Sequence, residues 1–364
     1  MIHHFQQHRV LVAMSGGVDS AVCAYLLQQK GYSLEGITMR LWAGKDRLPD
    51  TSAPAPDQNC LDAAAVAEQL NFPHHCVALG DSFRQAVINR FLADYENGAT
   101  PNPCVECNRH IKFGKLLEIA TNMGFDTLAT GHYARLEQTA SGEVLLKKAA
   151  DRSKDQSYFL WSIRRDALPH LLFPLGDYTK DEIREIAASN KLPCAHRTDS
   201  QDICFVPDGD YISFIESQTK KVFPCGQFVS CDGTVLGTHN GIIRYTVGQR
   251  KGLGIALGHP AFVGKKDAAK NTVTLCSDAE LYTSHLRAVS VNLLVNDDLS
   301  TPRRLEVKIR YRHTPAPALV TQIEEGKLSV QFDEPQRAIA PGQSAVLYDG
   351  DTLIGGGIIE AELP

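Results

Sequence analysis

The segment from Val10 to Gly31 constrains the fold of this chain more than any other stretch. An apolar run leads directly into Ser-Gly-Gly-Val-Asp-Ser at residues 15–20, and an amphipathic run closed by a glycine follows. A strand that feeds a glycine-rich turn and then a helix directs backbone N–H groups and the positive helix end toward one point, which suits a phosphate. The segment therefore predicts the first strand–loop–helix unit of a nucleotide-binding α/β domain.

The glycine loop differs from a Walker loop. It has no Gly-x-x-x-x-Gly-Lys-Ser/Thr pattern, so it lacks the lysine that would reach the terminal phosphates. The alternative is a tight turn in which Ser20 or Asp19 only caps the helix. We favour a phosphate site, because a cap needs one such residue and this loop offers Ser15, Asp19 and Ser20 around two glycines.

The alternation of apolar strands with helical stretches predicts a doubly wound parallel sheet. Residues 98–109 are expected to form a proline-punctuated loop, and residues 43–59 a surface loop rich in Pro, Asp and Ala. Thr179 to Glu182 have the form of a capping box. We expect strands at 10–14, 33–41, 74–79 and 127–133, and helices at 20–30, 60–70, 82–97, 110–123 and 180–189.

The residue pattern changes after about residue 210, where turn signals and short β-like runs dominate. A chain of 364 residues also exceeds what one hydrophobic core usually covers. We therefore expect an α/β domain at 1–210, a small mixed or β domain at 211–280, and a C-terminal β-barrel of about six strands at 281–364.

Composition restricts the partners and the compartment. No apolar run approaches the roughly 20 residues of a membrane span, and the first nine residues lack a secretory signal, so we expect a soluble, cytoplasmic protein without membrane contacts. The 37 basic residues against 42 acidic ones give a net charge of −5, so binding of a polyanion needs a local patch. Residues 301–313 hold five Arg or Lys against one Glu and could form it, or could be a solvated strand face.

The stretch Gly-Leu-Gly-Ile-Ala-Leu-Gly at 252–258 resembles a dinucleotide fingerprint. Its last gap is three residues instead of two, and it does not lie in a clear strand–helix–strand unit. We interpret it as a structural or substrate loop.

Ten cysteines in a chain of this class argue against a disulfide scaffold and for a few chemically active thiols. Cys23 and Cys60 fall in expected helices and Cys76 in an expected strand, so we assign all three to core packing.

Three other cysteines lie in turn-prone stretches, where thiols can be exposed and activated: Cys104 and Cys107 in Asn-Pro-Cys-Val-Glu-Cys-Asn, and Cys204 in Asp-Ser-Gln-Asp-Ile-Cys-Phe. Lys112 supplies a nearby cation that could lower the pKa of a thiol. Three interpretations remain open for the loop of Cys104 and Cys107: a dithiol for sulfur transfer, a metal or iron–sulfur site, and a structural loop. We favour sulfur transfer.

Ser-Gly-Gly-Val-Asp-Ser resembles the signature of the PP-loop ATP pyrophosphatases, which adenylate a carbonyl oxygen and release pyrophosphate. This motif is the first of six blocks that occur in the order seen in the bacterial tRNA-specific 2-thiouridylases. The blocks are SGGVDS, TPNPCVECNRHIKFGKL, ATGHYAR, KDQSYFLW, DSQDICF and GQRKGLGI. The likeness runs from residue 10 to the C-terminal barrel, so the chain is identified as a member of that family.

The resemblance implies an ATP site with Asp19 beside the pyrophosphate group and Mg²⁺, and with Met39 and Gly131 flanking the adenine and ribose. The implied ATP-binding residues are Ala13, Met14, Ser15, Gly16, Gly17, Val18, Asp19, Ser20, Met39 and Gly131.

The resemblance also assigns roles in sulfur transfer. It makes Cys107 the catalytic nucleophile and Cys204 the carrier of a persulfide. Cys104 stands where many relatives have Asp, so a [4Fe–4S] cluster on Cys104, Cys107 and Cys204 is a further option. The residues implied to contact tRNA are Asn102, Pro103 and Cys104 at the target base, and Lys154, Asp155, Gln156, Arg310 and Tyr311 elsewhere.

The resemblance implies ATP-dependent replacement of the C2 oxygen of the wobble uridine of tRNA by sulfur. A persulfide donor, either a sulfur relay protein or a cysteine desulfurase, is an implied partner. The alternatives are an amide-forming synthetase acting on a small molecule, which gives the cysteines no role, and a nucleotide-sensing RNA-binding module, which would release no pyrophosphate.

Overall fold

The computed structural model divides the chain into two compact units. Unit 1 comprises residues 1–86, 105–201 and 351–353, and unit 2 comprises 87–104, 202–350 and 354–364. The predicted loop at 43–59 falls almost entirely outside the described residues. The structure describes residues 9–41, 57–195, 197, 203–206, 209–296 and 298–361.

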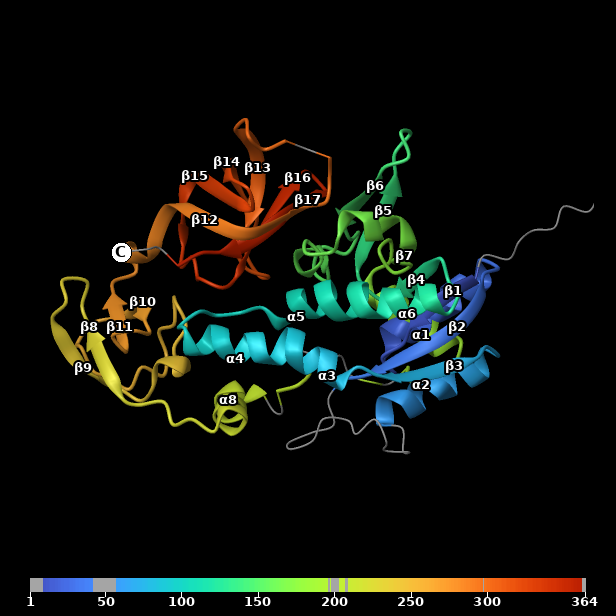
Figure 1. Ribbon diagram of the computed structural model, residues 1–364, viewed down its shortest axis with the longest axis horizontal. Helices are drawn as coiled ribbons and strands as arrows, with labels where there is room; N and C mark the ends of the chain where they lie inside the picture. The colour runs from blue at the N-terminus through green and yellow to red at the C-terminus, as the bar shows by residue number, and fades with distance from the viewer. Residues whose placement is uncertain are drawn as a thin grey trace, which may run out of the picture. The chain divides into compact units, whose positions relative to one another are not determined.

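Unit 1 is built on a five-stranded parallel sheet with the order β3-β2-β1-β4-β7 (Figure 1). The doubly wound α/β fold predicted from the sequence is thereby confirmed, although β4 ends three residues earlier than expected. The strands are β1 (Arg9–Ala13), β2 (Ser33–Arg40), β3 (His74–Ala78), β4 (Thr127–Thr130) and β7 (Leu171–Leu172).

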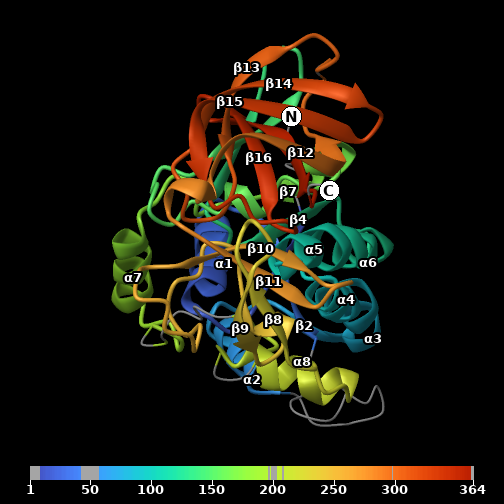
Figure 2. The same ribbon diagram turned by 90° about the vertical axis from the view of Figure 1, so that its left-hand side faces the viewer.

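Three helices of unit 1 share one buried cluster with β1, β2 and β4. They are α1 (Val18–Gln29), α2 (Gln58–Gln69) and α7 (Lys180–Ser189). Figure 2 shows α7 beside α1, and Ile183 and Ala187 of α7 are fully buried in that cluster. Gly31 ends the turn after α1 with a positive φ of 83°, which a residue without a side chain adopts without strain.

Two longer helical runs each contain a π-helical stretch, in which backbone bonds join residues five apart. The run predicted at 82–97 consists of α3 (Gly80–Phe83), η1 (Arg84–Ile88) and α4 (Asn89–Glu96). The run predicted at 110–123 consists of α5 (Pro103–Glu106), η2 (Cys107–Lys115) and α6 (Leu116–Asn122).

The second run corrects the sequence analysis. The prediction of a loop at 98–109 is wrong from Pro103 onward, because the helix begins at this proline. Proline is favoured in the first turn of a helix, where its missing N–H is not needed. Cys104 and Cys107 are therefore helical residues.

Further elements of unit 1 follow β4. An antiparallel hairpin that the sequence analysis missed is formed by β5 (Ala134–Gln138) and β6 (Val144–Lys148). Two short 3₁₀ turns, η3 (Ser157–Phe159) and η4 (Arg165–His170), precede β7. The α7 capping box is confirmed: Thr179 Oγ1 accepts from the Glu182 N–H, and Glu182 accepts from the Thr179 N–H.

Unit 2 carries a short helix and a small mixed sheet. The helix α8 (Tyr211–Thr219) is capped by the side chain of Asp210. The sheet has the order β10-β11-β8-β9 and contains one parallel pair, β11 with β8. Its strands are β8 (Gly226–Val229), β9 (Val235–His239), β10 (Phe262–Asp267) and β11 (Thr272–Cys276). The 3₁₀ turns η6 (Ile242–Arg244) and η7 (Ala279–Leu281) follow β9 and β11.

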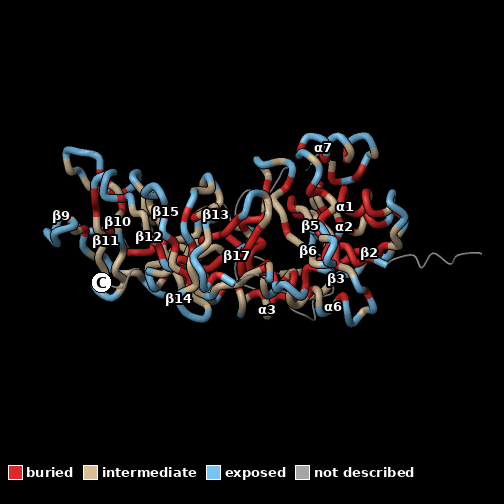
Figure 3. Tube along the Cα trace, turned by 90° about the horizontal axis from the view of Figure 1, so that it is seen from above, coloured by how far each residue is buried: buried red, intermediate tan, exposed pale blue. Residues whose placement is uncertain are grey.

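The six C-terminal strands close into a barrel in the order β12-β15-β14-β13-β16-β17, because β17 pairs back onto β12. This confirms the predicted barrel. Its interior is apolar, and the burial map shows β17 as a buried strand (Figure 3). The strands are β12 (Tyr282–Leu293), β13 (Arg303–Lys308), β14 (Ala316–Glu324), β15 (Lys327–Arg337), β16 (Ser344–Asp349) and β17 (Thr352–Ile359).

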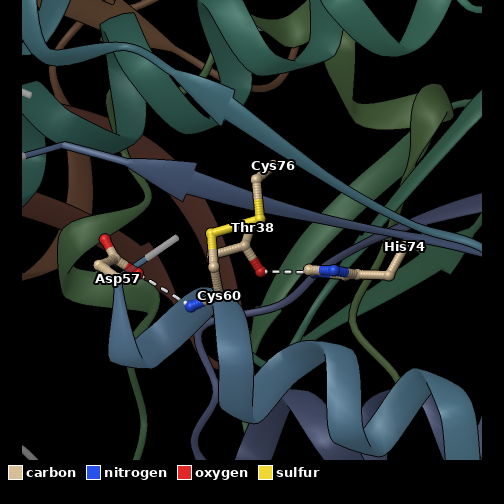
Figure 4. Close-up of a disulfide and its surroundings, with 5 residues drawn as sticks. All are labelled: Thr38, Asp57, Cys60, His74 and Cys76. Atoms are coloured by element: carbon tan, nitrogen blue, oxygen red, sulfur yellow. Dashed lines mark hydrogen bonds between the residues drawn. A yellow bond between two sulfur atoms is a disulfide. The ribbon is translucent and has the colours of Figure 1, made fainter. Parts of the chain in front are cut away.

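A disulfide joins Cys60 at the start of α2 to Cys76 in β3, with 6.4 Å between the Cα atoms (Figure 4). The assignment of Cys76 to core packing is wrong, because this residue is exposed. Cys60 is buried as expected, at 1% exposure, but it is bonded in the disulfide and is not a free thiol. Cys23, by contrast, is fully buried as expected, and burial raises the pKa of its thiol far above the usual value, with the Asp19 charge adding to the effect. No helix among the described residues is long and apolar enough to cross a membrane.

Candidate active site

The glycine loop lies where the strand order of the parallel sheet reverses. From β1 the chain proceeds outward to β2 and β3, and then returns to place β4 on the other side of β1. Parallel sheets of this kind bind ligands at the carboxyl ends of the strands beside such a reversal. The residues after Ala13 and those after Thr130 meet at this point.

Hydrogen bonds of Ser20 fix the conformation of the loop. The Ser15 N–H donates to Ser20 Oγ at 3.1 Å, and Ser20 Oγ donates to the Gly17 carbonyl at 3.0 Å. Gly16 has a φ of +75°, and a Cβ on it would lie 2.8 Å from the carbonyl oxygen of Asn59. Glycine is therefore required at residue 16, and the loop can approach a ligand closely.

Asp19, in the first turn of α1, receives two donors on one oxygen. The Tyr133 hydroxyl donates to Oδ1 at 2.8 Å, and the Lys180 ammonium donates to the same atom at 2.7 Å. The Lys180 side chain is only 6% exposed, whereas that of Asp19 is 34% exposed. Among the described residues none donates to Oδ2, the second carboxylate oxygen of Asp19.

Arg197 contacts the loop from another direction. Its Nη1 donates to the Gly16 carbonyl at 3.0 Å and lies 2.8 Å from Oδ2 of Asp62. A second guanidinium interaction joins it to Asn59 at 3.4 Å. The guanidinium of Arg197 thus places a positive charge beside the loop. The motif at residues 15–20 does not predict this charge, because Arg197 lies far away in the sequence.

The segment after β4 packs directly on the loop. A Cβ on Gly131 would lie 2.9 Å from the carbonyl carbon of Asp19 and 3.0 Å from the Ser20 nitrogen, so only glycine fits there. Met39 is half-buried near the carboxyl end of β2, and Met14 is buried, with its N–H bonded to the Ile37 carbonyl. The ATP-site residues named from the sequence therefore lie on adjoining segments of one sheet edge.

Cys107 is the first residue of η2 and is 7% exposed. Its neighbour Asn108 is 2% exposed and donates from Nδ2 to the Phe159 carbonyl at 2.9 Å. Ser162 donates to the Val105 carbonyl at 3.0 Å. The turn after Gln156 thus fixes the start of the helix that carries Cys107.

Lys112, five residues after Cys107 in the π-helix, contacts His132 from the β4 end. Burial, with the Lys112 charge beside it, lowers the pKa of His132 well below its usual value, so the ring is neutral. Nε2 then accepts from the Lys112 ammonium at 3.2 Å, and Nδ1 donates to Thr130 Oγ1 at 2.6 Å. His132 therefore orients the cation on the cysteine helix.

Cys104, placed in unit 2, is exposed on α5, next to the buried Pro103. The chain before it is bonded to a barrel loop of the same unit. The Thr100 N–H donates to the Pro341 carbonyl at 2.8 Å, and Gln343 Nε2 donates to the Thr100 carbonyl at 2.8 Å. The segment that ends in Asn102 is thereby tied to the barrel.

Cys204 lies in a turn of unit 2 and is exposed, which agrees with the sequence analysis. The next residue, Phe205, is buried and meets the rings of Phe91 and Phe214 at centroid distances of 5.3 Å each. The Val206 N–H bonds the Ile203 carbonyl at 2.9 Å. The buried ring of Phe205 therefore anchors the turn beside the exposed Cys204.

Three residues named as tRNA contacts, Lys154, Asp155 and Gln156, precede η3 and all have internal hydrogen bonds. Asp155 is 6% exposed and accepts from the Ala149 N–H at 2.9 Å and from Ser157 Oγ at 2.8 Å. Gln156 accepts from the Tyr133 N–H at 3.0 Å. Lys154 is half-buried. The Asp155 side chain thus stabilises this turn, while its role toward tRNA stays a prediction.

The basic stretch of the barrel is partly neutralised. Arg303 pairs with Asp349 at 2.6 Å, and Arg304 pairs with Asp333. Arg310 lies beyond the end of β13 and donates to the Arg337 carbonyl at 3.0 Å. A carbonyl oxygen carries no net charge, so this bond does not neutralise the Arg310 guanidinium. The Lys308 ammonium lies 5.4 Å from the ring centroid of Tyr311. Asp349 and Asp333 thus offset two of the five basic charges of residues 301–313, those of Arg303 and Arg304.

The described residues contain no group of three or more His, Cys, Asp or Glu side chains that could hold a metal ion. A single carboxylate with one available oxygen, as at Asp19, fits Mg²⁺, which keeps several waters and uses one or two protein carboxylates together with substrate phosphates.

Three family models match the chain in succession. They are described as a tRNA methyl transferase HUP domain at residues 8–208, a tRNA methyl transferase PRC-barrel domain at 213–277 and an aminomethyltransferase beta-barrel domain at 283–359.

Curated relatives match the whole length of the chain. A protein of Clostridioides difficile named tRNA-specific 2-thiouridylase MnmA is 43% identical over 360 residues, covering 99% of this chain and 100% of its own. Proteins of the same name from Acetivibrio thermocellus and Acidobacterium capsulatum are 45% and 47% identical, covering 97% and 96% of this chain and 99% and 98% of their own.

Proposed function

This chain belongs to the tRNA-specific 2-thiouridylase family, and from that premise we propose that it uses ATP to replace the C2 oxygen of the wobble uridine of tRNA with sulfur. One observation carries the proposal beyond family membership. Residues 130–133 contact both the ATP loop, through Gly131 and Tyr133, and the cysteine helix, through His132 and Lys112. Adenylation and thiol chemistry are thus served by one connected site.

The first step is adenylation of the base. The uridine O2 attacks the α-phosphorus of ATP, the bond to the β-phosphate oxygen breaks, and pyrophosphate leaves. The loop N–H groups and the start of α1 bind the phosphates, since a helix N-terminus favours negative charge. C2 becomes electrophilic because its oxygen has become part of a good leaving group, AMP.

The second step transfers sulfur. Cys204 carries a persulfide, and the Cys107 thiolate attacks the sulfur bonded to Cys204. A Cys107–Cys204 disulfide forms, the outer sulfur leaves as hydrosulfide with the electron pair of the broken S–S bond, and hydrosulfide displaces AMP from C2. A thiol reductant then restores both cysteines. Lys112, oriented by His132, provides a cation beside the thiolate of Cys107.

Asp19 would hold Mg²⁺ through its Oδ2. The ion would supply neutralisation of the developing charge on pyrophosphate. The iron–sulfur option receives no support from the described arrangement, so no step is derived through a cluster.

We assign tRNA contacts to three regions. Asn102, Pro103 and Cys104 would lie against the extruded base, since C2 is hard to reach within a base stack. Lys154 to Gln156 and the barrel residues Arg310 and Tyr311 would contact the tRNA backbone. The proposed domains are the catalytic domain at 1–210, the central domain at 211–280 and the barrel at 281–364. A persulfide-carrying protein in the cytoplasm is the proposed sulfur donor.

The experiment separates the two half-reactions. With tRNA and ATP alone, the native chain should release pyrophosphate and form adenylated tRNA, and AMP should leave only when a persulfide donor is added. Cys204→Ser should retain tRNA-dependent adenylation while thiolation is abolished, because its thiol carries sulfur and takes no part in phosphoryl chemistry. Asp19→Ala and Ser15→Ala should block both steps.

Pyrophosphate release measured by a coupled assay and thionucleosides measured by mass spectrometry give the two readouts. Normal thiolation by Cys204→Ser from a persulfide donor would contradict its role. Pyrophosphate release without tRNA would favour a small-molecule synthetase instead.

A further inference from the structure

The glycine loop contains an electrostatic conflict. Asp19 places a carboxylate in the first turn of α1, at the point where the loop and the helix end gather N–H groups for phosphate. Two like charges at close range repel, and the repulsion is stronger at a protein surface than in bulk water because the effective dielectric constant is lower. A polyanion can therefore bind here only if the charge of Asp19 is compensated.

Lys180 provides that compensation from a distant segment. It is the first residue of α7, 161 residues after Asp19, and its ammonium donates to Asp19 Oδ1 at 2.7 Å. The side chain is 6% exposed, and a buried ammonium is costly unless it is paired and hydrogen-bonded. The pairing with Asp19 is thus one of the interactions that stabilise this buried ammonium.

The local structure fixes Lys180 from both sides. The Thr179 capping box begins α7 at this residue, and the Lys180 N–H donates to Asp151 Oδ2 at 3.1 Å. The ammonium lies 5.8 Å from the Tyr133 ring centroid, and the hydroxyl of that ring donates to the same Asp19 oxygen. Both donors therefore bond the same oxygen, Oδ1.

We propose that Lys180 supplies a positive charge that residues 15–20 themselves do not contain: it neutralises Asp19 so that the loop accepts the pyrophosphate group of ATP. Lys180 is a positioning residue, because it acts through Asp19. The inference rests on the proposed function in one respect, the binding of ATP at this loop.

A double-mutant cycle on binding tests the inference without any turnover. The dissociation constants of inorganic pyrophosphate and of ATP are measured by calorimetry on the full-length chain, in the presence of EDTA and again with Mg²⁺. The variants are Lys180→Met, Asp19→Asn and the double variant. Lys180→Arg is the charge-retaining form, and Tyr133→Phe is the matched control that removes a donor to Oδ1 without changing charge.

In EDTA, Lys180→Met should weaken pyrophosphate binding by about tenfold to a hundredfold, the usual effect of losing a charge-assisted contact. Asp19→Asn alone should preserve or tighten binding, and the double variant should return to within about threefold of the native constant. Lys180→Arg should bind nearly as the native chain does. Tyr133→Phe should lose less than about threefold, because neutral hydrogen bonds contribute less.

Native affinity in Lys180→Met would overturn the inference, and so would a double variant as weak as Lys180→Met, since Lys180 would then contact phosphate directly. Circular dichroism identifies any variant that fails to fold, in which case Lys180→Arg against Asp19→Asn decides: native affinity in Lys180→Arg supports the inference, and a tenfold loss there contradicts it. If the native chain binds neither ligand, the proposed ATP site fails and the inference fails with it.

Discussion

Asp19 illustrates what local sequence does and does not reveal about single residues. The sequence identifies the loop, because glycines, serines and a carboxylate between a strand and a helix have few other uses. It does not identify Tyr133 and Lys180, which lie 114 and 161 residues away from Asp19. No spacing rule joins residues that only the tertiary fold brings together.

Gly131 allows a prediction at this scale. A Cβ there would lie 2.9 to 3.0 Å from backbone atoms of Asp19 and Ser20, and backbone cannot move as a flexible side chain can. Gly131→Ala should therefore weaken ATP binding at least about tenfold and lower the melting temperature. Calorimetry and thermal denaturation measure the two effects.

Gly17→Ala is the control for stability at the same loop. Its Cβ would meet only Ser15 Oγ at 3.5 Å, an ordinary contact. The melting temperature of this variant should stay near that of the native chain. A Gly131→Ala variant with unchanged melting temperature and ATP affinity would show that the loop and the β4 end are not in contact.

Among the elements, those with strong local signals were predicted well. Helix α7 begins at the capping box and spans the expected residues, and the first three strands agree within one residue at nearly every end. The helix of Cys107 was missed because Pro103 was interpreted as a loop signal, although proline equally suits the first helical turn. The Cys60–Cys76 disulfide was missed because it depends on how α2 lies over β3.

The α7 cap gives a prediction for an element. Thr179→Ala removes the acceptor of the Glu182 N–H and should cost about 1 kcal/mol. For a unit of this size the melting temperature should fall by about 2–4 °C. ATP affinity should fall as well, because the cap fixes Lys180.

Glu185→Ala serves as the matched control for the cap. Glu185 is exposed on the same helix, and alanine is a strong helix former. Its melting temperature and ATP affinity should remain close to native values. Equal losses in both variants would indicate a general effect of changing α7 and would contradict the specific role of the cap.

At the scale of the whole molecule, the sequence predicted the kinds of layers but not their long-range pairings. Turn signals and alternating runs indicate a barrel, yet closure depends on the pairing of β17 with β12, which joins residues as distant in the sequence as Ala288 and Ile359. The same holds for the basic stretch. Its charges could be counted, but the pairing of Arg303 and Arg304 with acidic partners required the fold.

The barrel gives the prediction for tRNA binding. Arg310→Ala should weaken tRNA binding and reduce the slope of log K against log salt by about 0.9, the contribution of one phosphate contact. Filter binding at several salt concentrations measures both quantities. Lys327→Ala is the control on the same barrel, because Lys327 already pairs with Glu324 at 2.9 Å. A slope unchanged in Arg310→Ala would place the tRNA contact elsewhere.

The central claim, sulfur insertion at C2 of the wobble uridine, is tested most directly by the nucleosides of the product. The full-length chain is incubated with tRNA, ATP, Mg²⁺ and a persulfide donor, and the digested tRNA is analysed by mass spectrometry while AMP is quantified. The account predicts 2-thiouridine at the wobble position and one AMP for each sulfur inserted. It predicts no 2-thiouridine in tRNA treated with Cys107→Ser. Formation of AMP with an unmodified wobble uridine, or sulfur at another atom of the base, would contradict it.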